Sequence, residues 1–110
     1  MADNFSKEDI QKLLDKHPGK IPVVVSKDKM KNGKSIKFIL PRESNVSDLL
    51  FILRRRLTLK STDAIYLYVV DKNDNKTLAM ASSQINNIYE DNKDNRNLLR
   101  FVYCEENTFG

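Results

Sequence analysis

The chain has 110 residues, of which 40% are hydrophobic, and a formal net charge of +4 at pH 7. This size and composition predict a single domain with a core, and exclude a wholly disordered chain. No apolar run reaches transmembrane length, the polar N-terminus does not resemble a signal peptide, and the single cysteine cannot form an internal disulfide. We therefore expect a protein of the reducing cytoplasm, whose mild charge does not by itself indicate nucleic-acid binding.

A helix is predicted to begin near the N-terminus. Ser6 is a good N-cap, Asp9 can return a bond to its backbone, and Phe5 can pack on Ile10. The helix should end at residues 17–19, His-Pro-Gly, because proline disfavours a helical residue before it and glycine permits a left-handed turn.

Two strands are expected next. Residues 21–25 are β-branched except for Pro22, which indicates an edge strand or the first residue of a strand. Residues 27–33 form a charged loop with an Asn-Gly turn signal. Ile36, Phe38 and Leu40 then alternate with Lys37 and Ile39, the period of a half-buried strand, until Pro41 ends the strand. The two strands are predicted to pair as an antiparallel hairpin.

The next predicted element is a helix over residues 46–57. Asn45 is a good N-cap, and Asp48 lies where an acid can complete a capping box. Apolar residues recur at helical spacing, namely Val46, Leu49, Leu50, Leu53 and Leu57. Arginines at positions 54–56 suit the negative end of the helix dipole, although they are equally typical of a solvated helix end.

Apolar side chains are expected on both faces of the second strand. Ile39 shares a face with Lys37, whereas Phe38 and Leu40 lie on the opposite face. Such a strand is either covered on both faces or keeps one face for a partner. Phe51 and Ile52 pose the same choice on the helix. Ordinary core packing explains Ile39, Phe51 and Ile52 as well as a binding surface does, when the residues alone are considered.

The second half of the chain predicts two more strands and a short helix. Its expected segments are a connector at 58–63, a strand at 65–70, a turn at 71–76, a helix at 85–89 after Ser82 or Ser83, a loop at 91–97 and a strand at 98–103. This order predicts an α+β, ubiquitin-like β-grasp with a mixed four-stranded sheet, a central helix and an added N-terminal helix. We assign residues 1–20 to the helical extension, 21–104 to the β-grasp domain and 105–110 to a flexible tail.

Several separated motifs, in order, make the chain resemble the GABARAP-type autophagy modifiers. They are Lys-His-Pro-Gly-Lys-Ile-Pro-Val-Val-Val at 16–25, Lys-Phe-Ile-Leu-Pro at 37–41, Leu-Arg-Arg-Arg-Leu at 53–57, and the segments 82–94 and 103–110. The resemblance covers roughly residues 7–110. It implies a ubiquitin-like modifier that is not itself an enzyme. Such a protein is monomeric and cytoplasmic when unconjugated and lies on the autophagosome membrane when lipidated.

The resemblance also implies partners and a conjugation residue. Gly110 would be activated by E1-like and E2-like conjugation enzymes and joined to phosphatidylethanolamine, and a cysteine protease would process or deconjugate it. Glycine suits this role because it has no side chain to obstruct a narrow enzyme channel. No cofactor, metal, catalytic residue or nucleic acid is implied.

Family members bind cargo-receptor peptides, aromatic-x-x-aliphatic in pattern, by adding them as a strand. Carried over by position, an aromatic pocket would be lined by Asp9, Leu13, Pro22, Lys37, Ile39 and Leu98. An aliphatic pocket would be lined by Phe38, Leu40, Pro41, Leu49 and Ile52. Lys37 and Arg56 would pair with acidic residues beside the motif.

The chain departs from the family pattern at several positions. Only one helix fits before Pro18, where the family has two. Ser44 stands where leucine is common, Leu49 and Leu98 where phenylalanine is common, and Arg100 where tyrosine is common. These differences indicate a divergent member with reshaped pockets.

Two other functions remain open from the sequence. One is a β-grasp modifier attached to a protein lysine, and the other is an unconjugated basic domain that binds RNA or an anionic membrane. The second would require salt-dependent binding, and aromatic residues are not interleaved on an exposed sheet as RNA binding favours. Cys104 and His17 have no partners in a catalytic motif, so both are expected to be structural.

Overall fold

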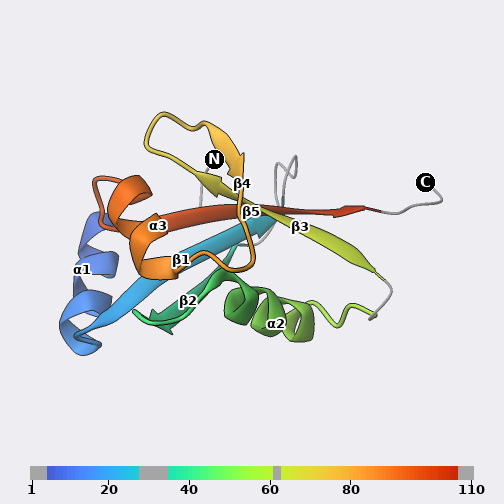
Figure 1. The fold of residues 1–110 in the computed structure, drawn as a ribbon. Helices are drawn as coiled ribbons and strands as arrows, with labels where there is room; N and C mark the ends of the chain where they lie inside the picture. Colours follow the sequence, from blue (N-terminus) through green and yellow to red (C-terminus); the bar gives the residue numbers. More distant parts are fainter. Residues whose placement is uncertain (1–4, 28–34, 61–62, 107–110) are drawn as a thin grey trace.

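The computed structural model describes residues 5–27, 35–60 and 63–106. Its elements in chain order are α1 (Lys7–Lys16), β1 (Lys20–Lys27), β2 (Ile36–Pro41), α2 (Val46–Arg56), β3 (Ala64–Val70), β4 (Lys76–Leu78), α3 (Ile85–Asn92) and β5 (Leu99–Glu106). They build one sheet in the order β2-β1-β5-β3-β4 (Figure 1). The β1–β5 pair is parallel and the other pairs are antiparallel, so the predicted mixed sheet and β-grasp class are confirmed.

The predicted helix starts are confirmed by their hydrogen bonds. In α1, the Asp9 backbone N–H donates to Ser6 Oγ over 3.1 Å, and the Ser6 N–H donates to Asp9 Oδ2 over 3.2 Å. Asn45 and Asp48 form the same reciprocal box at α2. Gly19 has φ of +77°, the left-handed conformation expected where the chain leaves α1.

Two details of the strands differ from prediction. The sheet has five strands among the described residues, because the three exposed residues Lys76–Leu78 form β4, whose pattern gave no signal of burial. β1 is an inner strand that begins at Lys20, so the prediction for Pro22 was wrong. β5 pairs with β1 only from Val23 onward, and therefore a residue without an N–H at position 22 costs no bond between these strands.

Both faces of the sheet carry buried side chains. Val23 and Val25 point into the main core, which is built with α2, α3 and every described strand except β4. Val24 points to the other face, where it packs with Ile10 of α1 and with Leu98. The sheet is thus covered on both faces at β1.

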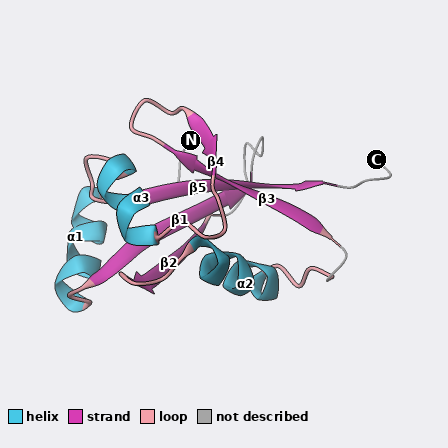
Figure 2. Cartoon of the chain, viewed as in Figure 1, coloured by secondary structure: helices cyan, strands magenta, loops and turns pink. Residues whose placement is uncertain are grey.

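The two edges of the sheet are formed by β2 and β4, which Figure 2 shows at opposite borders of the molecule. In the same view β5 runs from the end that carries α1 and α3 toward the opposite end. No helix in the part of the chain that the structure describes is long and apolar enough to cross a bilayer.

Candidate peptide-docking edge

Among the described residues the outer edge of β2 is the longer of the two sheet edges and is the candidate for strand addition. β1 pairs with one side of β2 from Lys20↔Pro41 to Val25↔Ile36, and no strand of residues 5–27, 35–60 or 63–106 pairs with its other side. An edge strand presents alternating N–H and C=O groups that an extended peptide can pair with. The opposite edge, β4, is only three residues long.

On the α1 face of β2, the candidate aromatic pocket has a polar border and a partly apolar base. Lys37 is exposed, Ile39 is half-buried, and Ile39 lies directly across from the buried Pro22 of β1. Lys37 lies across from Val24, which packs with Leu13 of α1. The Lys37 ammonium lies 5.4 Å from the centroid of the Phe5 ring.

Two residues predicted to line this pocket, Asp9 and Leu98, differ in their exposure to solvent. Asp9 is exposed at the start of α1, and the hydrogen bonds from the Ser6 backbone and side chain hold the pKa of its carboxyl below the ordinary value. Leu98 is fully buried in the cluster with Ile10 and Val24. A peptide could reach Leu98 only if α1 moved, so Leu98 supports the pocket from below.

On the α2 face, most predicted aliphatic-pocket residues belong to the main core. Phe38, Leu40 and Leu49 are buried there, whereas Ile52 is half-buried against them and Pro41 is exposed. A hollow of about 300 Å³ opens beside Ile52 and is otherwise lined by Arg55 and Arg56. The buried residues therefore form the wall behind a surface that Ile52 presents.

The arginines at the end of α2 cover aromatic rings. The Arg56 guanidinium lies 5.6 Å from the centroid of the Phe38 ring, and that of Arg55 lies 5.8 Å from the Phe51 ring. Phe51 is 63% exposed, so core packing does not explain it. Arg55 was not predicted as a site residue, because helical spacing alone does not show which of three arginines borders a hollow.

The remaining candidates lie away from this edge or outside the described residues. His17 is the C-cap of α1, and Cys104 is half-buried on β5. Gly110 lies beyond the last described residue of β5, Glu106.

Comparisons of the sequence and of the structure with known proteins agree on one family. The sequence profile of the family described as "Autophagy protein Atg8 ubiquitin like" matches residues 6–110. The chain is 30% identical to autophagy-related protein 8e of Arabidopsis thaliana, with 100% of this chain and 90% of the relative covered. It is 34% identical to human microtubule-associated protein 1 light chain 3 gamma, over 94% of this chain and 70% of the relative. The crystal structure of Trypanosoma brucei ATG8 superposes with a TM-score of 0.77 at 29% identity, covering 94% of this chain and 88% of that one.

Proposed function

Because the chain belongs to the Atg8 family of ubiquitin-like autophagy proteins, we propose that it is joined through Gly110 to phosphatidylethanolamine and docks aromatic-x-x-aliphatic peptides along β2. The observation that carries the docking proposal is the outer edge of β2, with which none of the described strands pairs and which has a different partly apolar surface on each side. In this role the chain is the substrate of enzymes and not an enzyme.

Docking uses the backbone of β2 for affinity and the two faces for selectivity. An added peptide strand sends alternate side chains to opposite faces, so its aromatic residue meets Ile39 on the α1 face and its aliphatic residue meets Ile52 on the α2 face. Lys37 and Arg56 are exposed on these two faces. Each would contribute about 0.5 kcal/mol with an acidic flanking residue, which steers the peptide more than it holds it.

Conjugation uses the chain end. Four residues, 107–110, follow Glu106, where β5 ends. Fully extended, they span at most about 14 Å, a reach that suits delivery of the carboxylate to an active site outside the folded body. E1-like and E2-like enzymes and a cysteine protease would act there. The conjugated protein would lie on the autophagosome membrane and recruit cargo-receptor peptides through β2.

The docking proposal is tested by NMR titration of the full chain with an acidic-flanked aromatic-x-x-Leu peptide. We expect the largest amide shifts at residues 36–41. Ile52→Ala should weaken binding about ten-fold, because it removes apolar contact from the peptide's aliphatic side chain. Leu78→Ala is the matched control, since Leu78 is exposed on the opposite edge. Shifts that avoid Phe38 to Leu40, or equal losses for the two variants, would contradict docking at β2.

The conjugation proposal is tested by incubating the chain with cognate conjugation enzymes, ATP and phosphatidylethanolamine liposomes. Wild-type protein should become lipidated, and Gly110→Ala should abolish the product. Cys104→Ser is the control and should react normally, because Cys104 is assigned no catalytic role. Lipidation of Gly110→Ala would refute the proposal. A conjugate found on protein lysine by mass spectrometry would favour the alternative modifier. Function retained with an uncleavable extension after Gly110 would favour an unconjugated domain.

A further inference from the structure

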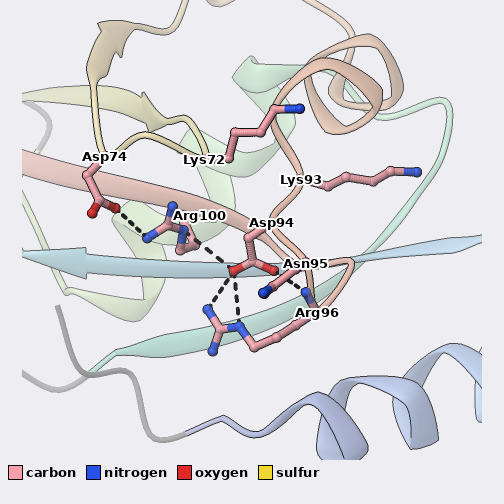
Figure 3. Close-up of a pocket in the computed structure, with 7 residues that line it drawn as sticks. All are labelled: Lys72, Asp74, Lys93, Asp94, Asn95, Arg96 and Arg100. Carbon is pink, nitrogen blue, oxygen red and sulfur yellow. Dashed lines mark hydrogen bonds and ion pairs between the residues drawn. The ribbon is translucent and has the colours of Figure 1, made fainter.

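A second hollow, of about 580 Å³, lies on the α1 face of the sheet. It is lined by Lys72, Asp74, Lys93, Asp94, Asn95, Arg96 and Arg100, which come from the β3–β4 turn, the α3–β5 loop and β5 (Figure 3). The lining holds four basic side chains against two carboxylates, a net formal charge of +2. Its position is separate from the β2 edge, because β1 lies between β2 and β5.

Arg100 is the central group of this hollow, and its hydrogen-bonding capacity is incompletely used. Its side chain is only 12% exposed. Nη1 donates to Asp74 Oδ1 over 3.0 Å, and Nη2 donates to the Asp71 carbonyl over 2.7 Å. Nε is buried without a hydrogen-bond partner among the described residues, and lies 3.6 Å from Asp94 Oδ2. The Asp94 carboxylate balances the buried Nε by charge but lies beyond hydrogen-bonding distance, so an anion that enters the hollow would meet a guanidinium without its full set of hydrogen bonds.

The acids present do not neutralise this cluster. Asp94 already accepts from Arg96 Nε over 3.0 Å and from Arg96 Nη2 over 2.7 Å. Its other oxygen accepts from the backbone N–H groups of Arg96 and Leu98. Asp74 is the second partner of Arg100, but its side chain is 79% exposed. An exposed carboxylate contributes little to a pair and can be displaced by a more highly charged anion.

Two lysines complete the positive border. In Figure 3 the side chains of Lys72 and Lys93 extend to the same side, with their ammonium ends turned away from the Arg100 guanidinium, so both would have to turn inward to share an anion with it. Lys93 lies 3.4 Å from Glu90, an exposed pair that solvent weakens. Compact ammonium groups beside planar guanidinium groups are the combination that proteins use to bind phosphate.

We propose that this hollow binds a phosphate group, carried by a small soluble molecule or by a lipid headgroup. Arg100 would donate from the base of the hollow, and Lys72 and Lys93 would close over the outer oxygens. The proposal does not depend on peptide docking or conjugation, because neither Gly110 nor the β2 edge takes part. It also gives a role to Arg100, which stands where the resembling family commonly has tyrosine.

The test is calorimetric titration of the full chain with pyrophosphate at fixed ionic strength. We expect saturable binding that the Lys72→Ala/Lys93→Ala double variant weakens about ten-fold or more, because two charge-assisted contacts are lost. Lys12→Ala/Lys16→Ala removes the same charge from exposed positions on α1 and should leave binding unchanged. Asp74→Asn should tighten binding, because it removes the acid that competes for Arg100. Asparagine tolerates the positive φ of 65° at this position.

Absence of saturable binding, equal weakening by both double variants, or weaker binding by Asp74→Asn would each overturn the proposal. An unchanged unfolding temperature for each variant separates a binding effect from loss of the fold. A second arm uses phosphatidylcholine vesicles that carry either a phosphoinositide or phosphatidylserine at equal charge. Phosphoinositide-selective binding that the Lys72/Lys93 variant loses assigns the phosphate to a lipid. Pyrophosphate binding without vesicle binding assigns it to a soluble molecule.

Discussion

The two faces of the sheet are covered by very different amounts of protein. On one face, α2 and α3 pack against β1, β2, β3 and β5 in a continuous core. On the other face, Ile10, Val24 and Leu98 form a small buried cluster under α1, to which Phe5, Leu13 and Leu14 add partly buried contacts. Since apolar burial supplies most folding free energy, the first face determines the fold, and the second can change with less effect on global stability.

Besides its small apolar cluster, α1 is held through Phe5, the residue before its N-cap. Arg96 Nη1 donates to the Phe5 carbonyl over 2.7 Å, and Lys37 lies over the Phe5 ring. The capping box of Ser6 and Asp9 fixes the first turn. These contacts are weaker than a buried core, so α1 is the element most able to adjust. Both the candidate aromatic pocket and the phosphate hollow lie on this more adaptable face.

The largest effect should come from the main core. Leu53 is fully buried on α2, and Leu53→Ala should lower the free energy of unfolding by about 3 kcal/mol, because it removes apolar contacts and leaves a cavity. Urea unfolding followed by circular dichroism measures the change. Leu50→Ala is the neighbouring control, since Leu50 is only half-buried and should cost less. Equal costs for the two variants would contradict the assignment of Leu53 to the core.

The elements with strong local patterns were predictable from sequence. The side chains of residues 36–40 follow the two-residue period of a strand, and each capping box marks the start of a helix. β2, α1 and α2 could therefore be predicted from residues close together in the sequence. β4 was missed because its three residues are all exposed and become a strand only through pairing with β3. A strand that depends on tertiary pairing leaves little periodicity to detect.

The candidate sites were less predictable, because they depend on how deeply each side chain is buried and on contacts between residues far apart in the sequence. The family resemblance assigned Leu49 and Leu98 to pockets, but a match of sequence positions does not reveal that both are fully buried. The phosphate hollow joins Asp74 to Arg100 across two different elements. No local motif links residues so far apart. Arg100 at a position where tyrosine was expected was the one available signal, and it indicated a reshaped pocket without locating it.

The second prediction addresses the smaller face. Ile10→Ala should lower the free energy of unfolding by about 2 kcal/mol, less than Leu53→Ala, because α1 can detach while the main core stays folded. Hydrogen exchange should show faster exchange throughout α1 and little change at the amides of β1. Equal acceleration of exchange in α1 and β1 would mean that the two faces of the sheet unfold as one unit and do not differ in stability.

The smallest effect concerns the charge that fixes the start of α1. Hydrogen bonds from Ser6 lower the pKa of Asp9 below the ordinary 3.8, and hydrogen bonds led by the Asn75 backbone lower that of Asp71 in the β3–β4 turn. A carboxyl whose pKa is lower in the folded state stabilises the fold above its unfolded pKa. That contribution disappears as the pH falls through the folded value. Acid should therefore destabilise both the start of α1 and the β3–β4 turn.

The variant Ser6→Ala should change the pKa of Asp9 without changing that of Asp71. It removes the Ser6 hydroxyl, the second cause of the lowered pKa of Asp9, and leaves the first cause, the bond from the Ser6 backbone N–H to Asp9 Oδ2. The pKa of Asp9 should therefore rise part of the way toward its ordinary value, while that of Asp71 in the β3–β4 turn stays unchanged. Loss of the N-cap should also cost α1 about 1 kcal/mol. NMR titration of the carboxyl carbons measures both pKa values in one sample. An unchanged pKa for Asp9, or an equal shift in the pKa of Asp71, would show that the cap does not act locally on α1. The independence of the two faces would then rest on hydrogen exchange alone.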